Sequence, residues 1–222
     1  MANKWMRGFC GAVLAASFGW LSVGVGNAAE LTPIEVTNLY LKAIVNHDES
    51  AIASLNAYLR PARGGVDFAS FSDLKEADAK YPEEITETLF DNIPIRYQQQ
   101  LKPLIMDVMR SQYDALLSTS CRALDTKPAK AARGQEAVMV TFECQMVQVP
   151  ESWSTVFRRL SEGKPSVDDY TQALRALERE YNARKTSPVR MDFPLARERR
   201  ANAIWRNDFP TETTNKLFYP DD

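Results

Sequence analysis

The residue types that most often perform chemistry are scarce in this chain. It has a single histidine, His47, and three cysteines, one of which, Cys10, lies in an apolar stretch near the N-terminus. One histidine excludes the paired-histidine motifs that bind catalytic zinc. After the N-terminal stretch the glycines are too dispersed for a phosphate-binding or dinucleotide-binding loop. We therefore expect no metal and no cofactor, and the composition favours a non-catalytic role.

Arginine and aromatic side chains gather toward the C-terminus. Both types dominate the energetics of protein interfaces, so they form the candidate partner-binding set. The alternatives are a solvated arginine face and an aromatic tail that packs back on its own domain. The set consists of Arg197, Arg199, Arg200, Arg206, Phe218 and Tyr219.

Two cysteines, Cys121 and Cys144, remain beyond the N-terminal stretch. Apolar residues alternate with polar ones over 138–146, which predicts a strand with one buried face. The stretch 118–126 predicts its antiparallel partner, with a polar loop over 127–136. A loop centred near 132–133 pairs residues whose numbers sum to about 265, which is the sum for the two cysteines. We therefore predict a disulfide across this hairpin.

Helical periodicity dominates the rest of the chain. Thr32-Pro33-Ile34-Glu35 predicts a capping box, and Asp48 predicts a second N-cap. Pro82 divides the next region into two expected helices, and Pro103 places the following helix start near Lys102. The segment 189–206 is ambiguous, because Val189, Met191 and Phe193 alternate as in a strand but residues 196–206 fit either a strand or a helix. These expectations define an α+β fold, in which several helices pack on a small antiparallel sheet. The expected helices are 32–46, 49–59, 72–80, 83–93, 99–117 and 152–162, with another capped by Ser166.

The N-terminus has the order of a secretory signal. Lys4 and Arg7 precede an apolar run over 9–25, and small residues lead to Ala28. This order predicts a cleaved signal peptide over 1–28, with a retained anchor as the alternative. Residues 29–222 then form a single domain in the periplasm or outside the cell, with no further membrane span. The net charge of −2 shows no basic excess of the kind that nucleic-acid partners require.

The start of this domain resembles the NTF2-like superfamily. The resemblance covers residues 32–59, two helices joined by Asn46-His47-Asp48, and more loosely the 118–149 hairpin. It implies a cone-shaped pocket in an apolar setting. In such a pocket a buried carboxylate could act with a tyrosine, for which Tyr40, Tyr97 and Tyr113 are the candidates.

Two hypotheses about function follow. The first is an exported binding or inhibitory protein, for example an immunity protein that neutralises a toxin, with another protein as its partner. The alternative is a small enzyme that works without histidine, through the carboxylate and tyrosine of an NTF2-like pocket. A deep pocket with a buried carboxyl group would favour the enzyme, and a protruding surface would favour binding.

Overall fold

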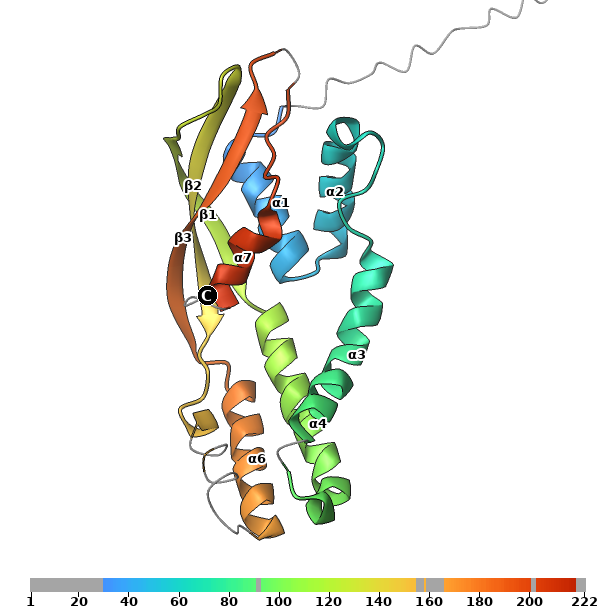
Figure 1. Ribbon diagram of the computed structural model, residues 1–222. Coiled ribbons are helices and arrows are strands. Elements are labelled where there is room, and N and C mark those ends of the chain that lie inside the picture. Colours follow the sequence, from blue (N-terminus) through green and yellow to red (C-terminus); the bar gives the residue numbers. More distant parts are fainter. Residues whose placement is uncertain (1–29, 91–92, 155–157, 159–165, 201–202, 219–222) are drawn as a thin grey trace, which may run out of the picture.

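The computed structural model describes residues 30–90, 93–154, 158, 166–200 and 203–218. Within these ranges helices pack on a three-stranded antiparallel sheet with the order β1-β2-β3. The sheet occupies one end of an elongated molecule, and a group of helices occupies the other (Figure 1). This arrangement confirms the predicted α+β class. No helix in the described part of the chain is long and apolar enough to span a membrane.

The first two helices begin where the sequence predicts. Helix α1 (Pro33–Val45) has a complete capping box, because the Thr32 N–H donates to Glu35 Oε2 at 2.8 Å and the Glu35 N–H donates to Thr32 Oγ1 at 3.3 Å. Helix α2 (Glu49–Leu59) is capped by Asp48, and the short 3₁₀ helix η1 (Arg60–Arg63) extends it. The joint between the helices turns sharply at His47, whose φ of +50° lies in the left-handed region.

The hairpin and its disulfide are confirmed. Strand β1 (Ser120–Pro128) pairs with β2 (Gln135–Val147), and Cys121 lies directly opposite Cys144, to which it is disulfide-bonded. The register shifts by one residue at a bulge between Ala123 and Asp125. The first part of the ambiguous segment, residues 189–198, lies in the third strand, β3 (Thr186–Glu198), which pairs with β2 along its full length.

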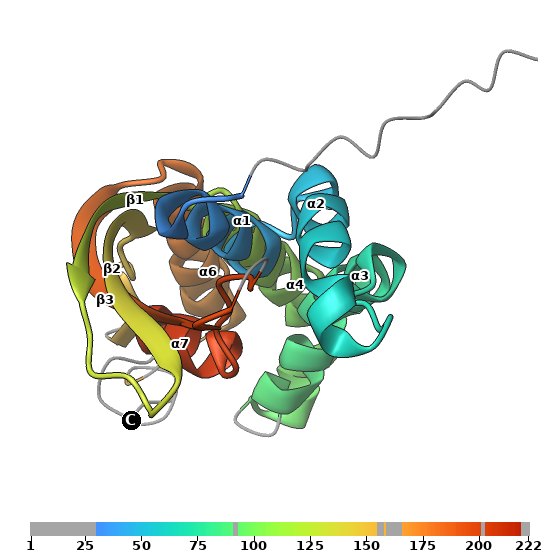
Figure 2. The same cartoon turned by 90° about the horizontal axis from the view of Figure 1, so that it is seen from above.

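The two faces of the sheet differ in chemistry. Its inner face lies against α1 and against α7 (Pro210–Phe218), as Figures 1 and 2 both show. Tyr40 of α1 packs on Phe193, which in turn contacts Phe142 edge to face. The outer face carries Glu143, which is ion-paired with an arginine on each neighbouring strand. This alternation is what a sheet with one solvated face requires.

Two predicted helix boundaries are wrong, both at prolines. Residues expected as two helices form one, α3 (Phe71–Phe90), with Pro82 inside it. Helix α4 (Ile95–Leu117) begins before the predicted start and holds Pro103 in its interior. An interior proline costs roughly 3 kcal/mol. Here tertiary packing offsets that cost, because Pro82 is buried and Leu101, two residues before Pro103, is fully buried.

A second apolar core lies at the end of the molecule away from the sheet. Helix α6 (Val167–Asn182) has the predicted Ser166 cap and places its stripe of Tyr170, Leu174, Leu177 and Tyr181 against α4. The first core is separate and joins α1, α2, the inner face of the sheet, Trp205 and Leu217. We call the two parts the sheet lobe and the helical lobe. Most of the helix expected over 152–162 lies outside the described residues.

Candidate functional site

Arg197 is held within the sheet lobe by several contacts. Its Nε donates to Glu136 Oε2 at 2.9 Å, and its Nη1 pairs with Glu30. The guanidinium carbon lies 4.3 Å from the centre of the Trp205 ring, in a cation–π contact. Arg197 therefore joins the start of the described chain to the last strand, and its charge is already compensated.

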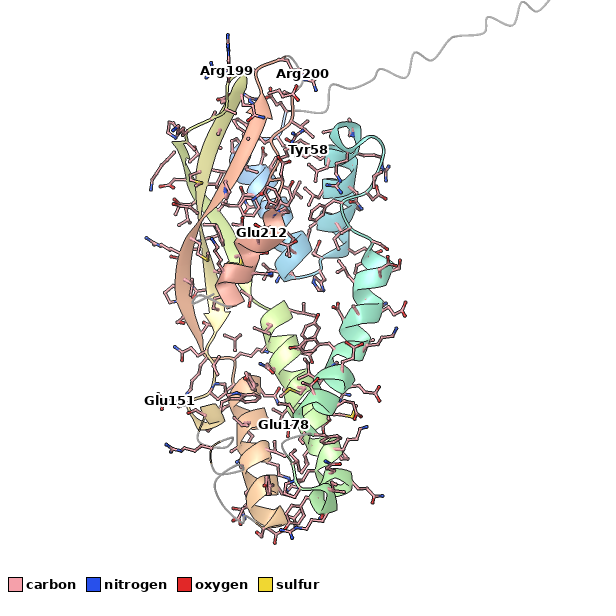
Figure 3. The ribbon with its side chains drawn as sticks, in the orientation of Figure 1. Tyr58, Glu151, Glu178, Arg199, Arg200 and Glu212 are labelled. Atoms are coloured by element: carbon pink, nitrogen blue, oxygen red, sulfur yellow. A yellow bond between two sulfur atoms is a disulfide. The ribbon has the colours of Figure 1, made fainter. Side chains whose placement is uncertain are left out.

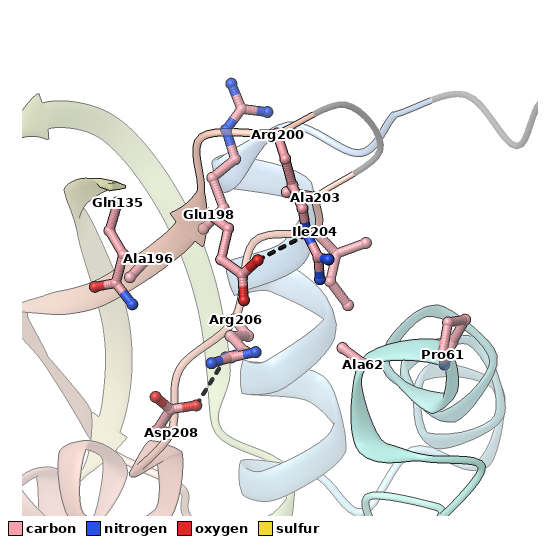
Figure 4. A pocket seen from close by; sticks show the side chains of 11 residues that line it. Pro61, Ala62, Gln135, Ala196, Glu198, Arg200, Ala203, Ile204, Arg206 and Asp208 are labelled. Carbon is pink, nitrogen blue, oxygen red and sulfur yellow. Dashed lines mark ion pairs between the residues drawn. The ribbon is translucent and has the colours of Figure 1, made fainter. Parts of the chain in front are cut away.

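Arg200 and Arg206 line a small cavity beside Arg197. The Nε of Arg200 lies 2.7 Å from Glu198 Oε2, and the Nε of Arg206 lies 3.0 Å from Asp208 Oδ1, as Figure 4 shows. The cavity has a volume of about 150 Å³ and is closed on one side by Pro61 and Ala62 of η1. Sites for cofactors and drug-sized ligands usually measure about 300–1,000 Å³, so this cavity fits at most a very small molecule.

Arg199 differs from the other three arginines. Its side chain is exposed and projects beyond the end of the sheet, as Figure 3 shows. Its backbone N–H donates to the Gly134 carbonyl at 2.9 Å, which fixes it beside the turn between β1 and β2. Gly134 has a φ of +82°, a conformation that glycine adopts without strain. The end of β3 and this turn therefore form one surface.

The end of β1 and the turn that follows it contribute basic residues that the sequence analysis missed. Lys127, Lys130 and Arg133 are exposed, and in the described part of the chain neither they nor Arg199 form an ion pair. We call these four residues the basic tip. From the sequence alone, the stretch 127–136 predicts only a polar loop. The strand register, in which Gln135 pairs with Glu198, brings the turn and its Arg133 close to Arg199. Lys127 lies further along the hairpin, opposite Met139.

The predicted aromatic tail is only partly described. Trp205 is buried, and its backbone N–H donates to the Tyr58 hydroxyl at 2.8 Å. Phe209 is 65% exposed. Phe218 ends α7, and Tyr219 lies outside the described residues. The role of Phe218 and Tyr219 in partner binding stays a prediction.

One of the three candidate tyrosines meets a carboxylate. The Tyr113 hydroxyl of α4 donates to Asp78 Oδ1 of α3 at 2.6 Å, and His47 Nδ1 lies 2.9 Å from the same oxygen. Burial raises the pKa of Tyr113 above its ordinary value, and the bond to Asp78 raises it further. Tyr40 instead bonds to the backbone of Asn207, and Tyr97 packs on Tyr170.

The Tyr113–Asp78 pair lies at the surface between the two lobes. The Asp78 side chain is 23% exposed, and that of His47 is 19% exposed. The carboxylate and tyrosine that the enzymatic alternative needs are thus together, but in a partly solvated setting. Among the described residues, no group of three or more histidine, cysteine, aspartate or glutamate side chains is placed to hold a metal ion.

Comparisons with known proteins show no family for this chain. No family model matches it, and no curated protein matches it. A solved structure of a Bacillus subtilis chain described as a candidate lipoprotein, ycdA, superposes with a TM-score of 0.41 at 10% sequence identity. The match covers 84% of this chain but only 54% of that one, so this chain spans about half the length of that protein.

Proposed function

We propose that this chain is an exported binding protein that captures an acidic protein partner at the basic tip and performs no chemistry of its own. The observation that carries the proposal is the set of four exposed cations at one end of the sheet, none ion-paired within the described residues. Such a charge arrangement accelerates association with an oppositely charged surface. Inhibition is the natural outcome if the partner's acidic surface borders its own active site.

Two observations support export. Residues 1–28 have the charged, apolar and small-residue order of a secretory signal. Cys121 and Cys144 are joined in a disulfide, which persists in oxidising compartments such as the periplasm and is rare in the cytosol. Together they support a location in the periplasm or outside the cell.

The site geometry favours binding over catalysis. The cavity of about 150 Å³ beside the tip is too small for most substrates, and its Arg200 and Arg206 are ion-paired with Glu198 and Asp208. A larger hollow of about 470 Å³ at the tip itself, lined by Arg133 and Arg199, is more open to solvent. A binding surface needs no enclosed cavity, only exposed groups in a fixed arrangement. The hydrogen bond from Arg199 to the Gly134 carbonyl supplies that fixed arrangement.

The test uses protein recovered from the periplasmic fraction. Bound partners are captured from the host's own envelope extract, identified by mass, and then titrated against wild type and variants. We expect the double variant Arg133→Ala/Arg199→Ala, which removes two residues of the basic tip, to bind at least tenfold more weakly. It should lose little stability, because exposed charges contribute little to it. Wild-type affinity should also fall as salt is raised.

The matched control is Arg175→Ala/Arg179→Ala, which removes two exposed arginines from α6 in the helical lobe. This control should bind like wild type. Equal weakening by both double variants would show a nonspecific charge effect. Unchanged binding by the tip variant would exclude the basic tip as the binding site. Turnover of a small substrate by the pure protein would exclude the hypothesis of a non-catalytic protein.

A further inference from the structure

Helix α3 is the element that bridges the two lobes. Phe71 and Leu74, near its start, pack against the core of the sheet lobe. Leu89 and Phe90, near its end, pack against the core of the helical lobe. Pro82 lies between these two pairs. The middle of this helix therefore contributes to the relative position of the lobes.

The middle of α3 is also its weakest point. A helical N–H normally donates to the carbonyl four residues earlier, and proline has no N–H. Pro82 therefore leaves the backbone carbonyl of Asp78 without its helical donor. Interior prolines bend helices at this position. The missing helical hydrogen bond is thus at Asp78, the residue whose side chain contacts His47 and Tyr113.

His47 approaches this point from the other lobe. Its Nδ1 lies 2.9 Å and 3.1 Å from the two carboxylate oxygens of Asp78. The preceding residue, Asn46, donates from its Nδ2 to the carbonyls of Leu117 and Thr119, at 2.8 Å and 2.7 Å. The joint between α1 and α2 is thus bonded both to α3 and to the connection between α4 and β1.

We propose that His47, Asp78 and Tyr113 form a proton-sensitive latch that fixes the two lobes across a hinge at Pro82. Tyr113 positions the carboxylate from within the helical lobe, and His47 ties it to the sheet lobe. Protonated imidazole bonds to the carboxylate as a cation, and neutral imidazole does so only as a dipole. Charge-assisted hydrogen bonds are roughly twice as strong as neutral ones, so acidification tightens the latch.

Several titratable groups surround the latch. His47 is the only histidine of the chain, and imidazole is the side chain whose ordinary titration falls between pH 5 and 8. The Asp48 carboxylate beside it caps α2, and that capping bond lowers the pKa of Asp48. The other titratable groups near the latch are Tyr81 of α3, which stacks on Tyr113, Tyr181 of α6, which interacts with Tyr81, and Lys42 of α1, which interacts with Asp48.

Hydrogen exchange followed by mass spectrometry tests the latch. Protection factors, corrected for the intrinsic rate, are compared for α3 at pH 5.5 and pH 7.5, which bracket ordinary imidazole titration. We expect protection around Asp78–Thr86 to be about fivefold higher at pH 5.5, because a charged bond adds about 1 kcal/mol over a neutral one. His47→Asn should abolish this difference, since asparagine tolerates the left-handed backbone at that position.

Two further variants separate the latch from general stability. Tyr113→Phe should lower protection at both pH values and leave their ratio unchanged. Lys80→Gln removes an exposed ion pair on the same helix and should match wild type. Asp78→Asn replaces His47→Asn if the latter does not fold, and should also abolish the difference. The proposal is overturned if wild type shows no pH difference, or if the difference survives in His47→Asn or Asp78→Asn.

Discussion

Removal of the disulfide should destabilise the sheet lobe by an amount set mainly by loop closure. The bond joins residues 23 apart in the sequence. On the chain-entropy model, closing a loop of this length stabilises the folded state by about 3 kcal/mol. For a chain of about 200 residues this corresponds to a fall in Tm of roughly 6–12 °C on reduction.

The double variant Cys121→Ala/Cys144→Ala should lose more than the reduced wild type. The Cys144 side chain is fully buried in the sheet-lobe core. Its truncation therefore adds a packing loss of about 1 kcal/mol, comparable to a buried methylene group. Comparing the reduced wild type with the double variant separates the packing loss from the loss of the covalent bond.

The assay is a thermal melt followed by near-ultraviolet circular dichroism, with and without a phosphine reductant. Tyr40, Phe142 and Phe193 lie in the sheet-lobe core and report its loss. Thiol titration after denaturation confirms the redox state of each sample. A reduced wild type that melts within about 2 °C of the oxidised protein would refute the loop-closure reasoning, because that shift is below the range of the model.

Two further predictions concern buried tyrosines. Among the described residues, the buried Tyr181 hydroxyl has no hydrogen-bond partner. Tyr181→Phe should therefore leave the free energy of unfolding unchanged or raise it by up to about 1 kcal/mol, as urea titration measures. A loss above about 1 kcal/mol would reveal a partner. Burial raises the pKa of Tyr40 to about 12, and an unfolded tyrosine ionises near 10. Because the pKa of Tyr40 is higher in the folded than in the unfolded protein, the stability that neutral Tyr40 contributes is fully present below pH 10 and is lost as pH rises toward 12. Absorbance at 295 nm should therefore show Tyr40 ionising only as the sheet lobe unfolds.

Local patterns allowed much of the fold to be predicted. The Thr32 and Glu35 pair predicted the start of α1, because both halves of a capping box lie within one turn. The register of Cys121 and Cys144 followed from a strand period of two and a loop centre. These features depend on residues near each other in the chain, whose interactions need no knowledge of the rest of the fold.

The errors and omissions depend on distant contacts. Pro82 and Pro103 read as helix boundaries, but burial of their surroundings keeps both helices continuous. The basic tip depends on the pairing of β2 with β3. Asp78 lies 31 residues from His47 and 35 from Tyr113, on a helix that is mostly exposed. No periodicity in the sequence indicates that these three side chains meet.

The order of elements along the chain has a consequence for how the protein is made. Helix α6 lies between β2 and β3, which are neighbours in the sheet, so β2 has one unpaired edge until β3 is synthesised. The β1–β2 hairpin is complete earlier and already contains both cysteines of the disulfide. Oxidation can therefore secure the hairpin before the sheet is finished. An exported nascent chain would meet its oxidant at the stage when its central strand is most open to wrong partners.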